Sequence, residues 1–386
     1  MAISAKDRKR HLWIVKFARR YLVPVIFKRI GFEMKAIDAD IPKPYIVLSN
    51  HTTDYDPIML EASLPDQMYF VASEHVFRKG FLSKLLVTFF DPIQRKKGVT
   101  EAGTVLEMAR RARAGYNLGI FPEGNKSFDG ESLHLHPTIG KLLKKLKINV
   151  VTMRIKGGYL TAPRWGHGIR KGKMWAELVN VYTVDEIEKM TSDELIHKIA
   201  DDIYVDAYTV EEAEKIRYRG KNKAHYLETA LWICPKCGKI GKLHSKGNFI
   251  ECDCGFRTEY DEYGRFSDGP FENVKQWYRW QMDRYYEMID EGTVEMPDDN
   301  VTVVEVQESK LIPVAKGSFR VGRHQVRLKG KDDTVRTFDD VHSLGLIGRN
   351  KLVFESGKNY YEVKCTERFC ALKYVKMFDR LSSETV

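Results

Sequence analysis

The chain has 386 residues, a net charge of +10 and an isoelectric point of about 9.1. This length allows two or three domains with separate hydrophobic cores, and the charge favours an anionic partner: lipid headgroups, nucleic acid or an acidic carrier protein. No run of about eighteen uncharged apolar residues occurs, which argues against a membrane-spanning helix, and no secretory signal peptide is evident.

Residues 1–36 are expected to form interfacial amphipathic helices. On a helical wheel, Trp13 lies at the border between a basic arc and an apolar side, Arg10 is an exception, and Pro24 interrupts the pattern. The basic arc holds Lys9, Lys16, Arg19 and Arg20, and the apolar side holds Ile14, Phe17, Ala18, Tyr21 and Leu22. Such a helix suits the headgroup region of a membrane; the alternative is a helix packed on a sheet with its basic face in water.

Residues 37–183 alternate short apolar runs with helical patterns. Residues 45–48 and 118–121 read as buried strands, and residues 101–114 form the clearest helical pattern. This alternation predicts an α/β domain, a mainly parallel sheet with flanking helices. Ligands of such sheets bind where the strands end, so polar motifs that follow different strands are expected to converge.

The first motif, Asn-His-Thr-Thr-Asp-Tyr-Asp at positions 50–56, follows the first strand. His51 can act as a general base near neutral pH, and Asp56 can accept a hydrogen bond from its other ring nitrogen. Pro57 suits a first helical position, so Asp56 is expected to be the N-cap of the next helix. Asp54 is the alternative partner of the histidine.

The second motif, Phe-Pro-Glu-Gly-Asn-Lys-Ser at positions 121–127, follows another strand. It supplies an acid, Glu123, a flexible glycine, Gly124, and a cation, Lys126, which suit a site for a phosphorylated alcohol. The two motifs predict acyl transfer from a thioester to the hydroxyl of a phosphate-bearing lipid. For Glu123, a structural pairing with Arg95 is an equal alternative to acceptor binding.

With these motifs, residues 40–180 resemble the glycerolipid acyltransferase family, which makes phosphatidic acid from lysophosphatidic acid. His51 and Asp56 match its first motif, residues 121–127 match its third, and Arg95 ends an apolar stretch that matches its second. Lys96 and Lys97 add charge there, and Lys126 stands where the family usually has arginine. A fourth motif, at 148–154, keeps the apolar strand but has Asn149 and Thr152 where the family has prolines.

The resemblance implies a 1-acylglycerol-3-phosphate acyltransferase with His51 and Asp56 as the catalytic pair. Arg95, Glu123, Gly124 and Lys126 would shape the phosphate site. The donor would be acyl-CoA or an acyl carrier protein, a possible partner, and the acceptor a lysophospholipid, with lysophosphatidic acid favoured. The enzyme would be cytoplasmic and peripherally bound to the phospholipid of the inner face of the cell membrane.

Two further segments of this domain have open interpretations. The apolar residues from Phe77 to Phe90 have helical spacing and are assigned to the core rather than to an acyl groove. The basic, glycine-rich residues 157–173 could contact phosphates or form a solvated loop.

Residues 184–230 are predicted to be a helical connector, with Thr191 and Glu194 as a capping box. Residues 231–268 are predicted to be a zinc ribbon. Two short cysteine pairs, each followed by glycine, provide the expected ligands of a structural zinc: Cys234, Cys237, Cys252 and Cys254. His244 is a substitute ligand, and disulfides are disfavoured without a secretory signal. Cys365 and Cys370 are expected to be core residues.

Residues 269–296 are predicted to be a helical linker and residues 297–386 a PH-like β-barrel. The barrel prediction rests on a C-terminal helix at 368–381 and on six strands with turn signals between them. The strands are 301–306, 311–314, 325–328, 334–338, 351–355 and 360–364. This architecture suggests a docking or regulatory module, although fold by itself does not establish a function.

A second class of function competes with the enzyme: a non-catalytic lipid-binding adaptor whose zinc ribbon binds protein or nucleic acid. The intact histidine–aspartate pair favours the enzyme, because a binding module has no use for it. Nucleic acid is disfavoured because few aromatic and basic residues lie between the two cysteine pairs.

Overall fold

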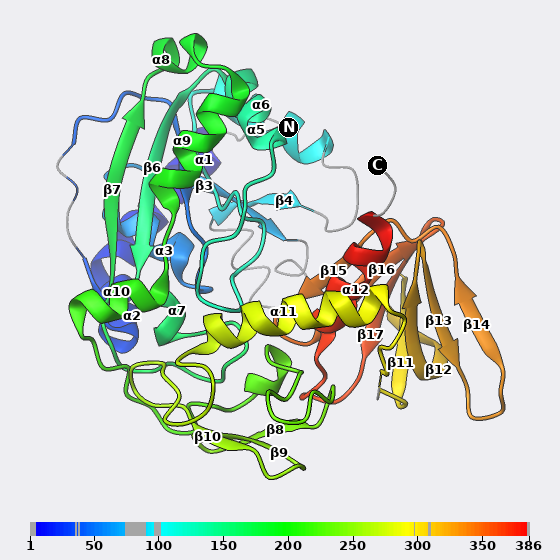
Figure 1. Ribbon diagram of the computed structural model, residues 1–386. Helices are drawn as coiled ribbons and strands as arrows, with labels where there is room; N and C mark the ends of the chain where they lie inside the picture. Colours follow the sequence, from blue (N-terminus) through cyan, green and yellow to red (C-terminus); the bar gives the residue numbers. More distant parts are fainter. Residues whose placement is uncertain are drawn as a thin grey trace. The chain divides into compact units, whose positions relative to one another are not determined.

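The computed structural model describes residues 5–34, 37, 39–73, 90–95, 102–296, 298–307 and 310–383 (Figure 1). The chain forms two compact units. The first unit comprises Met1–Arg164 and Gly168–Gly220, and the second comprises Trp165–His167 and Lys221–Val386. Lys96, Lys97 and nearly all of the apolar stretch expected at residues 77–90 lie outside the described residues.

The first unit contains a seven-stranded sheet in the order β1-β7-β6-β2-β5-β3-β4. The strands are β1 (Phe32–Glu33), β2 (Tyr45–Ser49), β3 (Met68–Ser73), β4 (Ile93–Arg95), β5 (Asn117–Ile120), β6 (Asn149–Lys156) and β7 (Met174–Tyr182). Every neighbouring pair is parallel except β6 and β7, which are antiparallel. The predicted mainly parallel sheet is confirmed.

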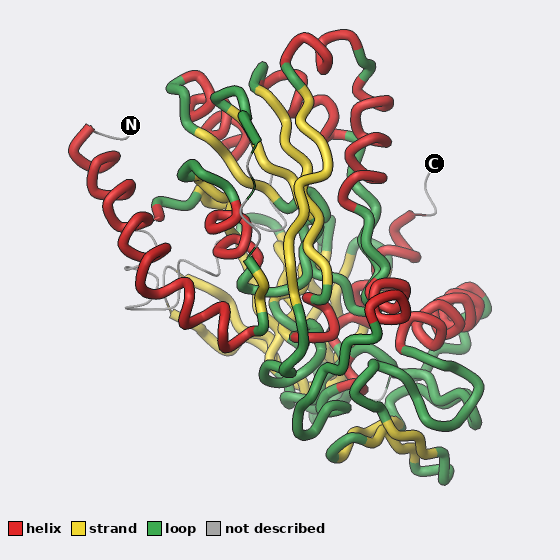
Figure 2. Tube along the Cα trace, turned by 90° about the vertical axis from the view of Figure 1, so that its left-hand side faces the viewer, coloured by secondary structure: helices red, strands yellow, loops and turns green. Residues whose placement is uncertain are grey.

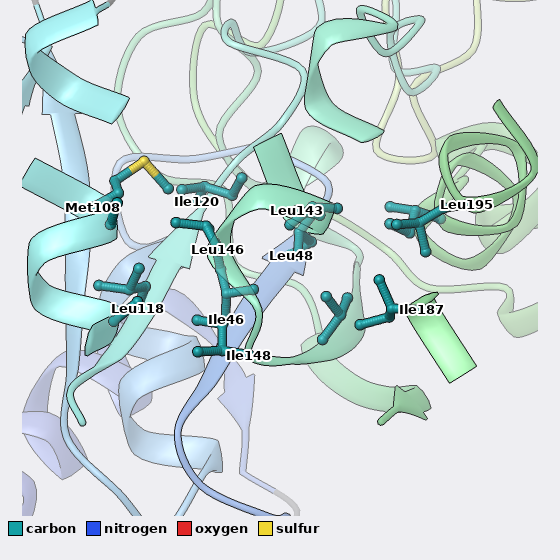
Figure 3. Close-up of a cluster of buried hydrophobic side chains, with 14 of the residues drawn as sticks. Ile46, Leu48, Met108, Leu118, Ile120, Leu143, Leu146, Ile148, Ile187 and Leu195 are labelled. Atoms are coloured by element: carbon teal, nitrogen blue, oxygen red, sulfur yellow. The ribbon is translucent and has the colours of Figure 1, made fainter. Parts of the chain in front are cut away.

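Both faces of this sheet are buried, which explains why β2 is a continuous apolar run rather than an alternating one. Ile46 and Leu48 point into one hydrophobic cluster, and Tyr45 and Val47 point into the other. Figure 3 shows the first cluster, in which strand residues meet the helices α5 (Ala102–Arg113), α6 (Thr138–Leu146), α8 (Val184–Lys189) and α9 (Ser192–Ile203). The second cluster includes residues of α2 (Val23–Ile30) and α3 (Asp56–Ser63).

The predicted helical connector is largely part of the first unit. Helices α8 and α9 contribute Ile187 and Leu195 to the sheet's core, and α10 (Ala207–Glu214) follows them. The predicted capping box of Thr191 and Glu194 is present at the start of α9. The boundary between the units falls after Gly220 rather than at residue 230.

The N-terminal segment forms one nearly continuous helical rod: α1 (Ala5–Phe17), a π-helical turn η1 (Ala18–Leu22) and α2 (Figure 2). Pro24, which interrupts the amphipathic pattern in the sequence, falls where the α-helix starts again after the π-helical turn. Pro24 lies in the first turn of α2, where its missing N–H and fixed φ are compatible with a helix.

One side of this rod packs on the unit and the other side exposes apolar residues. Val15 and Phe27 are buried, whereas Trp13 is 66% exposed and stacks on Phe17 with ring centroids 5.6 Å apart. The exposed apolar residues of the rod are Leu12, Trp13, Phe17, Tyr21, Leu22 and Val25. No helix among the described residues is long and apolar enough to cross a bilayer.

Arg19 does not lie on a free basic arc, contrary to the sequence prediction. Its guanidinium pairs with the Glu61 carboxylate at 3.2 Å and donates to the backbone carbonyls of Glu61, Pro65 and Asp66. Glu61 lies in the last turn of α3, where helix carbonyls lack helical partners, and Pro65 and Asp66 lie just after the helix. Arg19 therefore links the N-terminal rod to α3 through hydrogen bonds and an ion pair, and its guanidinium does not face solvent.

The second unit begins with a small three-stranded antiparallel sheet in the order β10-β9-β8. Its strands are β8 (Leu243–Lys246), β9 (Phe249–Cys252) and β10 (Arg257–Glu259). Helix α11 (Val274–Asp290) follows within the predicted helical linker at 269–296, and Asn273 is its N-cap.

A seven-stranded antiparallel sheet and helix α12 (Ala371–Ser383) complete this unit, with the order β14-β13-β12-β11-β17-β16-β15. The strands are β11 (Val301–Gln307), β12 (Lys310–Gly322), β13 (Gln325–Lys329), β14 (Val335–Phe338), β15 (Leu344–Ile347), β16 (Lys351–Ser356) and β17 (Asn359–Lys364). Sequence reasoning missed β15 and ended β12 at residue 314. The strand instead passes through Pro313, beside a register shift, and continues to Gly322.

Candidate functional site

The first motif is anchored to the sheet by Asn50, directly after β2. Its side-chain amide donates to the Ile155 carbonyl at 2.8 Å, and its side-chain oxygen accepts from the Ile155 N–H at 2.7 Å. Sequence reasoning assigned no role to Asn50. The two hydrogen bonds fix the end of β2 against β6, so the following residue, His51, leaves the sheet in a defined direction.

The predicted hydrogen bond between His51 and Asp56 is present, with 2.8 Å between Nδ1 and Oδ2. The Asp56 carboxylate is fully buried and also accepts from the backbone amides of Thr52 and Thr53, at 2.6 and 3.0 Å. Asp54, the alternative partner, is 86% exposed and pairs instead with Lys126. The structure therefore brings Asp56, and not Asp54, to the imidazole.

Asp56 was predicted to be the N-cap of α3, and this prediction is wrong. Asp56 is the first helical residue, and the preceding residue, Tyr55, is the N-cap. Its carboxylate turns back to the loop amides of the motif and away from the free amides of the helix. Both carboxylate oxygens already accept hydrogen bonds from the loop amides and the imidazole, so the side chain does not cap the helix.

The imidazole is held by an aromatic stack as well. The ring of His51 lies 4.3 Å from that of Phe121, at an interplanar angle of 19°, and Phe121 stacks in turn with Phe70 at 6.0 Å. The His51 side chain is 21% exposed. Because Nδ1 is engaged by Asp56, Nε2 is the ring nitrogen left to meet a substrate.

Glu123 joins the second motif to the first. Its Oε1 accepts from the His51 backbone N–H at 2.8 Å, and its Oε2 accepts from the Leu133 N–H at 2.7 Å. Burial raises the pKa of this carboxyl to about 8, although the two amide hydrogen bonds oppose the shift. Of the two roles considered for Glu123, these contacts favour the structural one. The partners seen here are the backbone amides of His51 and Leu133, whereas the expected partner was Arg95.

Arg95 ends β4 and reaches the second motif. A Cβ added to Gly124 would lie 3.2 Å from Arg95 Nη1, so the guanidinium packs directly against this glycine. Gly124 also has a φ of +68°, a conformation that favours glycine. Lys126 lies 2.9 Å from the Asp54 carboxylate, and this ion pair links the two motifs a second time.

A pocket lies beside His51 and draws its walls from both motifs. Its lining residues are Asn50, His51, Thr52, Glu123, Ser127, Gly130, Glu131, Ser132, Ile155, Gly157, Gly158, Tyr159, Val205 and Ala207. A Cβ on Gly158 would lie 2.1 Å from Thr52 Oγ1, so only glycine fits there. Gly157, Gly158 and Tyr159 of the glycine-rich segment therefore line the pocket, and Arg170 is buried, whereas Lys171 is exposed.

The polar residues of the fourth motif serve the fold. Thr152 donates to the buried Asp202 carboxylate at 2.8 Å, and Asn149 donates to the Pro42 carbonyl at 2.9 Å. Both side chains thus tie β6 to neighbouring segments.

The four predicted zinc ligands converge in the second unit. The sulfur atoms of Cys234, Cys237, Cys252 and Cys254 all lie within 4.8 Å of one another. The separations are 3.7 Å for Cys234 and Cys254 and 3.8 Å for Cys237 and Cys252. Tetrahedral zinc with bonds of about 2.3 Å requires sulfur separations of about 3.8 Å, whereas a disulfide requires about 2.05 Å.

The cysteine cluster therefore fits a tetrahedral thiolate site, and all four are free thiols. His244 is not a member; its nitrogens face the carboxylates of Glu251 and Asp253 at 3.7 and 3.9 Å. Gly238 and Gly255 follow the cysteine pairs with φ of +71° and +84°, the tight turns that were expected.

Comparison with known proteins identifies the first unit. Residues 35–156 match the family model described as Acyltransferase. The 1-acyl-sn-glycerol-3-phosphate acyltransferase of Saccharomyces cerevisiae is 24% identical over 204 residues, which span 50% of this chain and 65% of the yeast protein. The match thus spans less than two thirds of that relative's length.

Among solved structures, the 1-acyl-sn-glycerophosphate (LPA) acyltransferase PlsC from Thermotoga maritima aligns with a TM-score of 0.44 and 19% identity. The alignment covers 54% of this chain and 81% of that one. The range of the family match, 35–156, contains every residue predicted for the catalytic and phosphate sites. Through these residues, the first unit is similar to the acyltransferase family.

Proposed function

We propose that the protein transfers a fatty acyl group from a thioester to the free hydroxyl of a lysophospholipid. The favoured acceptor is lysophosphatidic acid, which would yield phosphatidic acid, and the donor is acyl-CoA or an acyl carrier protein. The observation that supports this most directly is the hydrogen bond between His51 and the buried Asp56 beside a pocket. The yeast relative, a 1-acyl-sn-glycerol-3-phosphate acyltransferase, is named for this reaction.

In this proposal His51 is the general base. Its Nε2 takes the hydroxyl proton as the acceptor oxygen attacks the thioester carbonyl carbon, while Asp56 stabilises the imidazolium through Nδ1. The tetrahedral intermediate then collapses with cleavage of the carbon–sulfur bond. The imidazolium returns the proton to the departing thiolate, so the products are an ester and a free thiol.

The phosphate of the acceptor would be bound near the second motif. Arg95 and Lys126 supply positive charge, Gly124 lets the guanidinium approach the backbone, and Glu123 holds the two motifs in register. Lysine binds phosphate as a point charge rather than as a fork, so Arg95 would provide the directional contact.

We also assign a structural zinc to Cys234, Cys237, Cys252 and Cys254. Four thiolates leave no open coordination position, so the ion would stabilise the fold of the second unit and take no part in the acyl transfer. The seven-stranded antiparallel sheet with helix α12 is consistent with a PH-like module, which we propose as a docking domain.

The N-terminal rod would hold the enzyme peripherally on the inner face of the cell membrane, where the lysophospholipid is found. Its exposed surface combines Trp13, Phe17 and Tyr21 with the exposed cations Lys9, Lys16 and Arg20, as interfacial helices do. The competing function, a non-catalytic lipid-binding adaptor, gives no reason for an imidazole fixed by a buried aspartate next to a pocket.

The test is a transfer assay with purified protein, vesicles that contain one lysolipid from a panel, and acyl-CoA or acyl carrier protein as donor, with products identified by mass spectrometry. His51→Ala should lower the rate by about a hundred- to ten-thousand-fold. His134→Ala is the matched control, because this histidine is exposed and outside the pocket.

Wild-type protein that forms no ester with any donor would contradict the enzyme and favour the adaptor. A correctly folded His51→Ala variant with the rate of the His134→Ala control would contradict the assigned base.

A further inference from the structure

The positive charge of the chain is concentrated in one segment of the second unit. Residues 310–338 contain eight lysines and arginines and two aspartates, a net charge of +6 out of +10 for the whole chain. These residues form β12, β13 and β14, which lie side by side at one end of the sheet (Figure 1).

Four of these eight cations lie on one face of the three strands: Lys316, Arg320, Arg327 and Lys329. Phe319, Val321, Val326, Leu328 and Phe338 are buried on the opposite face. Between them, the side chains of the other face form two rows across the strands: Arg320, Arg327 and Thr337, and Ser318, Lys329 and Val335. Ser318 is half-buried and the other five are exposed. We call these six residues and Lys316, the next exposed cation along β12, the basic face.

The basic face contains an arrangement that is unfavourable for folding. Arg320 and Arg327 are direct cross-strand partners, and like charges in this position destabilise a sheet. Within the described part of the chain, no carboxylate forms an ion pair with either arginine or with Lys316. Lys329 forms an ion pair with Asp333 at 2.7 Å. At the edge of the face, the Asp299 carboxylate accepts a hydrogen bond from the Ser318 hydroxyl. An anionic partner would relieve this repulsion.

The apolar content of the segment indicates which anionic partner fits. Proteins that bind single-stranded nucleic acid stack bases on exposed aromatic rings, but the two phenylalanines of residues 310–338 are both buried. The exposed apolar side chain on the face is aliphatic: Val335, 60% exposed and directly opposite Lys329. A groove beside the face is lined in part by Lys316, Val335 and Arg336.

We propose that the basic face binds the anionic surface of a phospholipid bilayer. Phosphate and carboxylate headgroups would neutralise Arg320 and Arg327, and Val335 would contact the apolar boundary of the headgroup layer. This contact is separate from that of the N-terminal rod.

The experiment measures co-sedimentation of the full chain with vesicles of phosphatidylcholine alone or with added phosphatidylglycerol, at low and at high salt. The variant Arg320→Gln/Arg327→Gln should weaken binding to the anionic vesicles by about ten- to thirty-fold at low salt, since each cation near the surface contributes about 1 kcal/mol. The control Lys221→Gln/Lys358→Gln removes the same charge from exposed positions of the same unit outside the basic face and should bind as wild type does.

A thermal melt of the two double variants makes the test independent of misfolding. Removing the opposed arginines should leave the melting temperature unchanged or raise it, because the repulsion between them is lost. The proposal fails if both double variants lose vesicle binding equally, or if Arg320→Gln/Arg327→Gln melts lower than the control. It also fails if that variant loses binding to an acidic protein or a single-stranded oligonucleotide while vesicle binding is unchanged. Because no turnover is measured, the result is independent of the proposed acyl transfer.

Discussion

Asp56 shows how one residue can hold an active-site geometry from inside the protein. Its buried carboxylate collects the imidazole of His51, the backbone amides of Thr52 and Thr53, and the Thr53 hydroxyl. A buried carboxylate stays ionised only when donors of this kind compensate its lost hydration. The loop between β2 and α3 is therefore organised around the acid that orients the imidazole.

Glu123 is also a buried acid, but here burial raises the pKa of the carboxyl more than its two hydrogen bonds lower it. Its pKa of about 8 means that the folded state keeps the proton at a pH where the unfolded chain has released it. The free energy of unfolding should therefore fall as the pH rises from about 5 to about 8, since the unfolded state binds fewer protons over this range.

Glu123→Gln should remove this part of the pH dependence, because glutamine resembles the protonated acid and does not titrate. We expect the melting temperatures of wild type and variant to be closest near pH 5 and to separate towards pH 8, where the variant should melt higher because it has no carboxyl to ionise on unfolding. Scanning calorimetry across this range checks the prediction. Parallel curves for the two proteins would show that Glu123 is already ionised in the folded state.

At the scale of the elements, the position of His51 depends on strands that carry no predicted site residue. Phe121 follows β5 and stacks on the imidazole, and Phe70 of β3 stacks on Phe121. Gly119 of β5 makes room for this arrangement: a Cβ there would lie 2.4 Å from the Phe70 ring. The pairing of β3 with β5 therefore sets the stack that supports the imidazole.

Gly119→Ala should displace Phe70 and, through Phe121, the imidazole. We expect a loss of about 1–3 kcal/mol in the free energy of unfolding from overpacking, and a lower acyl-transfer rate in the folded protein. Urea unfolding and the transfer assay measure the two effects.

Gly103→Ala is the matched control, because a Cβ at this position of α5 meets nothing within 4 Å. It should stay within about 1 kcal/mol of wild type. A Gly119→Ala protein with normal stability and rate would show that the stack is not tightly packed around His51.

At the scale of the whole molecule, the chain combines a unit similar to the acyltransferase family with a second unit that has its own cysteine cluster and its own antiparallel sheet. The cluster lies outside the matched family range of 35–156. Metal binding there is expected to be coupled to the folding of the second unit, because the four thiolates meet only when that unit is folded.

Chelation of the metal should therefore lower the thermal stability of the second unit without directly inhibiting acyl transfer. Elemental analysis should find one zinc per chain in wild type and none in Cys237→Ser/Cys254→Ser. The control Cys365→Ser should retain the metal, since this cysteine is not part of the cluster. Full zinc content in the double variant, or immediate loss of turnover on chelation at a temperature where the protein stays folded, would contradict the structural role.

Several features followed from the sequence because they depend on spacing along a short stretch of chain. Asp56 lies five positions after His51, and the predicted hydrogen bond between them is present. The cysteine pairs predicted the sulfur cluster, and the alternation of apolar runs with helical patterns predicted the parallel sheet. The strand β15 was not predicted, because four residues that include a glycine show too short an apolar alternation to distinguish a strand from a turn.

Other features could not be read from the chain because they depend on which distant segments meet. The spacing that placed Arg19 on a solvent-facing arc says nothing about the carbonyls at the end of α3, which bind it. From the sequence, Asp54 and Asp56 were both possible partners of His51. In the structure Asp54 forms an ion pair with Lys126, which comes from another loop. The opposition of Arg320 and Arg327 follows from the register of β12 and β13.

The sequence by itself determined the chemistry available to this protein: an imidazole with a nearby acid, a glycine-bearing acidic loop, four paired thiols and an excess of positive charge. Only the tertiary structure decided which of these groups are buried, which donors compensate them and which charges face each other. The physical reason is that short spacings fix local geometry, whereas burial, pKa shifts and charge repulsion arise from contacts between segments far apart in the chain.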